Sequence, residues 1–174
     1  MKKIYIILMH TNTLPAKLIR IFTRYKYSHV GISLDRSCDT IYSFGRKTLH
    51  NFMNSGFCIE YKNGEFFKLF NKTTCKIFEI EVTNDQYQKT MDILSDMTSH
   101  SDLYKYDFWG LIPRYFGIPF TCKNRYVCSY FVAYVLEQAG ICHFDKETCL
   151  MFPKDFANLK ELREIYKGQY LEYK

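Results

Sequence analysis

A chain of 174 residues, of which 47% are hydrophobic and 18% aromatic, can bury a core of its own, and this composition argues against an intrinsically disordered protein. The net charge of +6 is spread along the chain apart from a loose basic group, and no basic motif indicates a nucleic-acid-binding module. That group is interpreted either as one solvated face of a helix or as a contact for an anionic partner; it comprises Lys17, Arg20, Arg24 and Lys26.

The cysteine pattern indicates a reducing compartment. Seven cysteines are dispersed without a CxxC pair, so neither a disulfide framework nor a zinc site of the usual ligand spacing is expected. The apolar run after Met1 is too short for a signal peptide and has no small-residue cleavage site, and no later run reaches membrane-spanning length. The sequence therefore predicts one soluble, cytoplasmic domain over 1–174, with no metal and no cofactor.

The first elements predicted are a strand and a helix. Residues 2–9 are β-branched and aromatic, which is typical of a strand. Pro15 then opens a run over 14–27 whose apolar residues recur at helical spacing.

A β-hairpin is predicted next. Over 28–35 apolar and polar residues alternate, which indicates a strand with His29 on the face opposite Val30. A short polar turn leads to a second strand at 40–47, and so short a connection favours antiparallel pairing.

The middle of the chain predicts three strands, a helix and an aromatic connector. The strands are expected at 56–61, 64–70 and 75–82, with Asn63-Gly64 as the turn between the first two, and the helix at 83–97 with Thr83 or Asn84 as its cap. Residues 99–124 form a connector rich in aromatic residues that contains two prolines and two glycines over 106–120. We expect a short helix within it, and interpret it either as a surface loop packed on the core or as an apolar acyl-binding wall.

The strongest helix prediction covers 125–140, and a further helix is expected over 152–166 with Asp155 as a possible cap. Gly140 stands where a C-terminal cap belongs. The apolar stripe of the 125–140 helix consists of Cys128, Phe131, Val132, Val135, Leu136 and Ala139.

Cys128 falls in the first turn of that helix. A helix N-terminus presents unpaired N–H groups and partial positive charge, which favour thiolate over thiol and can hold an oxyanion. Such a nucleophile needs a proton acceptor, and His29, on a strand, is a candidate for that role. The structural alternatives are that Cys128 is a small core residue and that His29 is a packing residue.

Two segments together resemble a known superfamily. YSHVGISLD around His29, followed about 100 residues later by YVCSYFVAYVLEQAGI around Cys128, is similar to the circularly permuted papain-like superfamily, which includes NlpC-like permuted amidases, YiiX/YycO-like proteins and lecithin:retinol acyltransferase relatives. In this superfamily the His strand precedes the Cys helix. The resemblance implies an α+β fold in which an antiparallel sheet carries His29 and the helix of Cys128 packs against it.

The resemblance also implies thiol chemistry. Cys128 would attack an amide or ester carbonyl, His29 would move the proton, and water or another acceptor would resolve the acyl-enzyme. The expected activity is that of a cysteine hydrolase, an amidase or thiol peptidase. Its substrate would be peptide-like or peptidoglycan-like, or alternatively an acyl lipid.

The third member of the site stays open between two residues. Relatives place a polar residue on the strand after the His strand to orient the imidazole, and here that position favours Ser43 slightly. Glu60 is the competing candidate. Tyr27, beside the His strand, and Arg46, at the end of the next strand, are candidate substrate-binding residues.

Two other functional classes compete with the enzyme. Because no carboxylate stands at the expected third position, the same fold can instead be a non-catalytic ligand-binding module. A redox-sensing thiol, with Cys128 paired to Cys122 or Cys142, is less favoured because CxxC spacing is absent.

Overall fold

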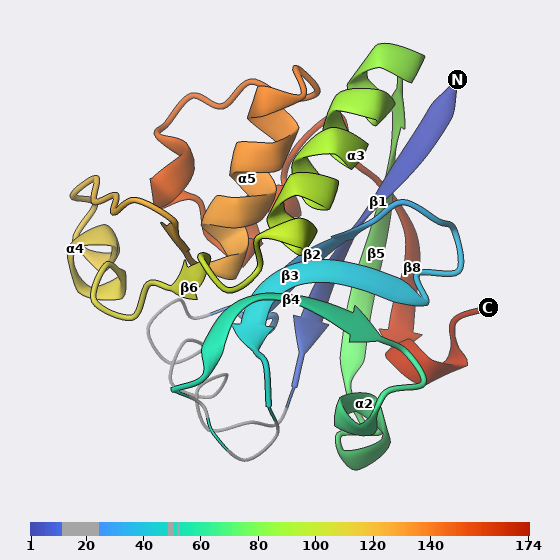
Figure 1. The fold of residues 1–174 in the computed structure, drawn as a ribbon. Coiled ribbons are helices and arrows are strands. Elements are labelled where there is room, and N and C mark those ends of the chain that lie inside the picture. The colour runs from blue at the N-terminus through green and yellow to red at the C-terminus, as the bar shows by residue number, and fades with distance from the viewer. Residues whose placement is uncertain (12–24, 49–50, 52) are drawn as a thin grey trace.

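The computed structural model describes residues 1–11, 25–48, 51 and 53–174, which form a mixed α+β fold (Figure 1). Its strands are β1 (Lys2–His10), β2 (His29–Ser33), β3 (Thr40–Arg46), β4 (Ser55–Tyr61), β5 (Thr74–Val82), β6 (Lys105–Tyr106), β7 (Arg125–Tyr126) and β8 (Arg163–Gln169). Its helices are α2 (Glu65–Leu69), α3 (Asn84–Ser99), α4 (Leu111–Tyr115), α5 (Cys128–Gln138) and α6 (Pro153–Phe156), with short 3-10 turns at Thr148–Leu150 and Tyr170–Glu172.

One curled sheet organises these elements in the order β7-β6-β4-β3-β2-β1-β5-β8. Every neighbouring pair is antiparallel except β6 and β7, which are parallel over two residues. β1 lies inside the sheet between β2 and β5, and its residues from Ile4 to Met9 are buried on both faces. The predicted hairpin is confirmed, because β2 and β3 pair antiparallel.

Helices α3 and α5 lie side by side over one face of the sheet (Figure 1), and α5 contacts β2 and β3. The core beneath them contains Val30 and Ile32 from β2 and Phe44 from β3. The predicted stripe of α5 is fully buried in the core, so the helical spacing read from the sequence is confirmed. Gly140 follows the helix with φ of 68°, a left-handed conformation that suits glycine at this position.

The boundaries of the helices differ in detail from the prediction. Thr83 is the cap of α3, where its side chain accepts from Gln86 N (3.2 Å) and its own N–H donates to Gln86 Oε1 (2.9 Å). Helix α5 begins at Cys128 rather than at 125, because Arg125 and Tyr126 pair with β6 as β7. The helix predicted over 14–27 lies largely outside the described residues.

The prediction of a strand at 64–70 is wrong, because Glu65–Leu69 form α2. Their apolar residues fit helical spacing as well as strand alternation, and the rings of Phe66 and Phe70, one turn apart, have centroids 4.9 Å apart. Phe67 is buried in a second core on the opposite face of the sheet. The burial of this one side chain therefore favours the helix over the strand, although the local sequence pattern is compatible with both.

The prediction of one helix over 152–166 is also wrong. Only Pro153–Phe156 is helical, and Asp155 accepts from Phe152 N at 2.7 Å in its first turn. Arg163–Gln169 instead pairs antiparallel with β5 as the edge strand β8. The open edge of β5 offers a full row of backbone hydrogen bonds, which outweighs the weak helical preference of this polar segment.

In the part of the chain that the structure describes, no helix has the length and apolar character needed to cross a membrane.

Candidate active site

Cys128 is the first residue of α5, the helix that packs most closely on the His strand. The residue before it, Val127, is the N-cap and supplies no capping side chain. The N–H groups of the first turn are therefore not bonded by a cap, and they surround the thiol with partial positive charge. The Cys128 side chain itself is 3% exposed.

His29 is the first residue of β2, and its ring is held by the next two strands. Nε2 lies 3.0 Å from Oε1 of Glu60 on β4 and 3.0 Å from Oγ of Ser43 on β3. Both candidates for the third member therefore contact the same ring nitrogen.

The partners of His29 also determine its tautomer. Ser43 donates its hydroxyl proton to the carbonyl oxygen of Val30 at 3.1 Å, so its oxygen is left to accept. The Glu60 carboxylate is an acceptor as well, and both contacts are satisfied when Nε2 carries the proton. The other ring nitrogen, Nδ1, is then free to take a proton from a nucleophile.

The pKa of His29 lies well above its ordinary value. Burial of the ring acts in the opposite direction, but the negative charge of Glu60 and hydrogen bonds with the Cys128 thiol and with Glu60 together raise the pKa. Cys128 therefore lies close enough to the imidazole to influence its pKa. An imidazolium at this place has a carboxylate on one side and the thiol on the other, which is the charge arrangement of a Cys–His pair.

Cys58 is a second thiol beside Glu60, and its pKa responds differently to the carboxylate. Its sulfur lies 4.0 Å from Oε1 of Glu60. Burial, and then the charge of Glu60, raises the pKa of the Cys58 thiol well above its ordinary value. Cys58 is therefore held as a protonated thiol, although it lies within the same cluster as His29.

Gly45 gives the ring and the carboxylate the room they occupy. A methyl group at this position would lie 3.2 Å from Oε1 of Glu60 and 3.6 Å from Cε1 of His29. The first of these separations is tighter than an ordinary contact, so Gly45→Ala has to displace the carboxylate by a few tenths of an ångström.

We expect Gly45→Ala to reduce the rate at which iodoacetamide alkylates Cys128 near neutral pH by about tenfold, because a small misplacement of a catalytic group has a large effect. Peptide mapping by mass spectrometry measures the rate, and urea unfolding checks that the variant is folded. An unchanged rate in a folded variant would show that the position of Glu60 does not govern the thiol.

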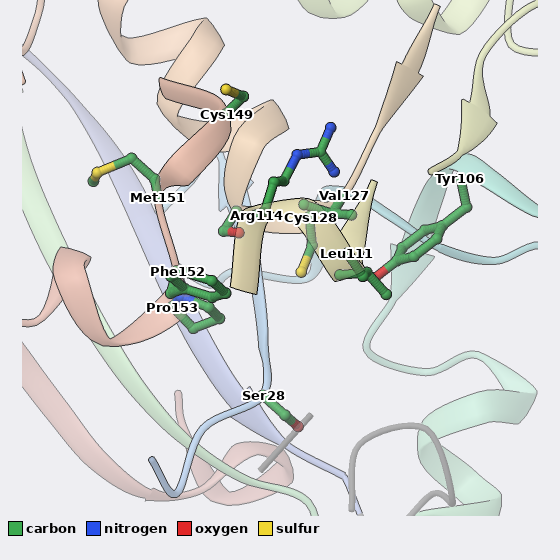
Figure 2. A pocket seen from close by; sticks show the side chains of 11 residues that line it. Ser28, Tyr106, Leu111, Arg114, Val127, Cys128, Cys149, Met151, Phe152 and Pro153 are labelled. Carbon is green, nitrogen blue, oxygen red and sulfur yellow. The ribbon is translucent and has the colours of Figure 1, made fainter. Parts of the chain in front are cut away.

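A small cavity opens beside Cys128 (Figure 2), with a volume of about 30 Å³. This is on the scale of a single water molecule, so the cavity as it stands admits only a small group. The lining is largely apolar and comes from β6, α4, the start of α5 and the segment that leads into α6; it includes Tyr106, Leu111, Val127, Met151, Phe152 and Pro153.

Tyr106 is a site residue that the sequence analysis did not single out. Its ring is directed from β6 toward Cys128 and Leu111 (Figure 2). Burial, followed by the nearby Cys128, raises the pKa of Tyr106 well above its ordinary value, so its hydroxyl remains a donor. The chain has 15 tyrosines, none at a distinctive spacing. The sequence therefore indicated Tyr106 only through the interpretation of the connector as an acyl-binding wall.

The two predicted substrate-binding residues are not brought to the cavity. Tyr27 is 3% exposed and belongs to the core beneath α5. The Arg46 guanidinium lies over the rings of Phe66 and Phe70, at 5.8 and 5.9 Å from their centroids, and so contacts α2. Neither position supports the substrate-binding role.

The described residues contain no group of three or more His, Cys, Asp and Glu side chains that could hold a metal ion. No protein-family model matches the chain, and no curated protein matches it either.

Proposed function

We propose that the chain is a cysteine hydrolase of the permuted papain-like type, with Cys128 as nucleophile and His29 as general base. The observation that carries the proposal is the His29 ring, whose Nε2 is bound by Glu60 and Ser43 and whose pKa is raised in part by the neighbouring Cys128. Glu60 supplies the carboxylate whose expected absence was the argument for a binding module. Ser43, bonded to the Val30 carbonyl, holds the ring orientation with it.

The geometry supports a two-stage reaction. In the first stage, the Cys128 sulfur, whose proton has passed to His29, attacks the carbonyl carbon of an amide or ester, and the carbonyl electron pair moves to oxygen. The N–H groups at the start of α5 stabilise that oxyanion, and the Tyr106 hydroxyl is a further donor at the cavity. The oxyanion collapses, the carbon–nitrogen or carbon–oxygen bond breaks, and the leaving group takes the proton from His29.

In the second stage, His29 removes a proton from water, and the resulting hydroxide attacks the thioester carbon. The carbon–sulfur bond breaks, the acid is released, and the Cys128 sulfur is again paired with the protonated His29. If an amine or alcohol replaces water, the same steps give acyl transfer. The apolar lining by Leu111, Met151 and Phe152 favours a substrate with an apolar acyl group, whether its scissile bond is an amide or an ester.

The reactivity of Cys128 toward iodoacetamide tests the proposal. An ordinary thiol, with a pKa near 8.5, is only about one per cent thiolate at about pH 6.5, so a thiol paired with an imidazolium can react up to about 100-fold faster at this pH. We expect Cys128 to keep most of its own alkylation rate as the pH is lowered from about 9 to about 6.5, whereas the rate of the exposed Cys122 falls steeply over the same range. If the alkylation rate of Cys128 falls with pH as steeply as that of Cys122, Cys128 is not an activated nucleophile.

A further inference from the structure

The connector around α4 carries a group of large apolar side chains that face solvent. Their exposed fractions are 79% for Trp109, 61% for Ile112, 71% for Phe116, 57% for Ile118 and 39% for Phe120. Single exposed apolar residues are normal, but five within twelve residues form a patch of the kind that marks an interaction site. We refer to these five residues as the α4 surface.

Exposed and buried side chains are interleaved along the α4 surface. Trp109, Ile112 and Phe116, on and beside α4, are exposed, whereas Leu111 and Arg114, between them, line the cavity beside Cys128. The same turn of backbone therefore has an inner side at the candidate active site and an outer side in solvent. Figure 1 shows α4 at the periphery of the molecule, away from α3 and the central strands.

The inner side of the connector is anchored by a buried ion pair. Arg114, which is 2% exposed, donates to Oδ2 of Asp107 at 2.7 Å and to the carbonyl oxygen of Phe120 at 2.9 Å. Its guanidinium also lies 5.4 Å from the centroid of the Tyr130 ring on α5. These contacts join Asp107 and Phe120 to Arg114, which itself lies against α5, so that the outer side chains are presented by a fixed scaffold.

The exposed charges within the segment that carries the α4 surface have one sign. Between residues 103 and 127 the exposed charged side chains are Lys105, Lys123 and Arg125. The one acidic residue in this range, Asp107, is 1% exposed and paired with Arg114. The patch therefore combines protruding aromatic and aliphatic side chains with three cations from the same segment, while exposed carboxylates flank the segment at Asp102 and at Glu147, the N-cap of the 3-10 turn that contacts α4.

We propose that the α4 surface docks on an anionic lipid membrane, with Trp109, Ile112 and Phe116 inserted at the interface. Tryptophan and phenylalanine flanked by lysine and arginine are the side chains that bind this interface, because the rings enter the headgroup region and the cations meet anionic lipids. A second copy of the chain fits less well: a symmetric contact through this surface would bring the same three cations face to face. Docking would place the cavity of Cys128 next to the lipid surface.

The fluorescence of the chain provides a direct test, since Trp109 is its only tryptophan. The protein is mixed with phosphatidylcholine vesicles, or with vesicles of phosphatidylcholine and phosphatidylserine at about seven to three. We expect a blue shift of the emission and quenching by brominated lipid with the anionic vesicles, and a much smaller response with phosphatidylcholine alone. Vesicle binding is measured without any substrate, so its result does not depend on whether Cys128 is a nucleophile.

Two sets of variants separate the contributions, with co-sedimentation as the readout. Ile112→Ala with Phe116→Ala, and separately Lys105→Gln with Lys123→Gln and Arg125→Gln, should each weaken binding to anionic vesicles by at least about tenfold. The matched control is Tyr61→Ala with Leu69→Ala, two side chains of similar exposure (57% and 62%) near α2, which should bind as the original chain does.

Three results would overturn the proposal. One is the absence of any shift or quenching of Trp109 with anionic vesicles. Another is equal loss of binding in the control variant. The third is a blue shift that appears on raising the protein concentration without lipid, together with a dimer in analytical ultracentrifugation, which would assign the α4 surface to self-association.

Discussion

Replacing His29 by alanine is expected to slow the alkylation of Cys128 at about pH 6.5 by about 100-fold, to the rate of an ordinary thiol. The physical reason is that the variant loses the imidazolium that pairs with the thiolate, while the position of Cys128 at the start of α5 is kept. Turnover of any ester or amide substrate should fall by about 100- to 10,000-fold, the range for loss of a general base. Peptide mapping and a turnover assay measure the two effects.

His100 provides the matched control, because it also contacts a carboxylate. Its Nδ1 lies 3.2 Å from Oδ1 of Asp96, one turn away on α3. His100→Ala should leave the alkylation of Cys128 unchanged. Equal rates for His29→Ala and the original chain, with both proteins folded by circular dichroism, would contradict the assignment of His29 as the base.

Replacing Glu60 by glutamine is expected to lower the pKa of His29, because the neighbouring negative charge is a main cause that raises it. Burial of the ring lowers the pKa of His29, and in this variant fewer interactions oppose that effect. Titration of the imidazole C–H signals by NMR, assigned with His29→Ala, measures the change directly. In a turnover assay, the alkaline limb of the pH profile, on which His29 loses its proton, should move to lower pH.

The raised pKa of His29 also predicts how the free energy of unfolding depends on pH. A histidine whose pKa is higher in the folded than in the unfolded chain stabilises the fold fully below the unfolded value of about 6.5, and this contribution is lost as pH rises through the folded value. Glu60→Gln should therefore cost about 1 to 2 kcal/mol of unfolding free energy at about pH 5.5, and the cost should shrink at higher pH. Urea unfolding at several pH values measures it.

The exposed Glu65 is the control for this series, and Glu65→Gln should show no such dependence on pH. A destabilisation by Glu60→Gln that is constant with pH would mean that its carboxylate acts by packing alone. Ser43→Ala should shift the pKa of His29 less than Glu60→Gln does, because a hydroxyl orients the ring but carries no charge to stabilise the imidazolium.

The elements predicted most accurately are those whose pattern is set by near neighbours along the chain. The stripe from Cys128 to Ala139 recurs at three and four residues, and all of its members, on α5 and at its C-cap, are buried. Alternation around His29 likewise placed Val30 in the core beneath that helix and His29 on the opposite face of the strand. Gly140, in the left-handed conformation, ended the helix as its position indicated.

The errors arose where local patterns are ambiguous. Glu65–Leu69 is compatible with a strand or a helix, and the burial of Phe67 under the second face of the sheet favours the helix. Arg163–Gln169 has modest helical character, but the free edge of β5 turns it into a strand. In both cases the deciding partner is distant in sequence, and a local pattern carries no information about it.

In the candidate site too, local patterns predicted some of the residues and tertiary contacts decided the others. The sequence by itself determined that Cys128 lies in the first turn of a buried helix and that His29 lies on a strand, on the face opposite Val30, since both statements depend on residues a few positions apart. Only the tertiary structure decided that Glu60, 31 residues from His29, reaches the same ring nitrogen as Ser43. The reason is that the order and register of β2, β3 and β4 set which side chains meet, and long-range pairing fixes that register.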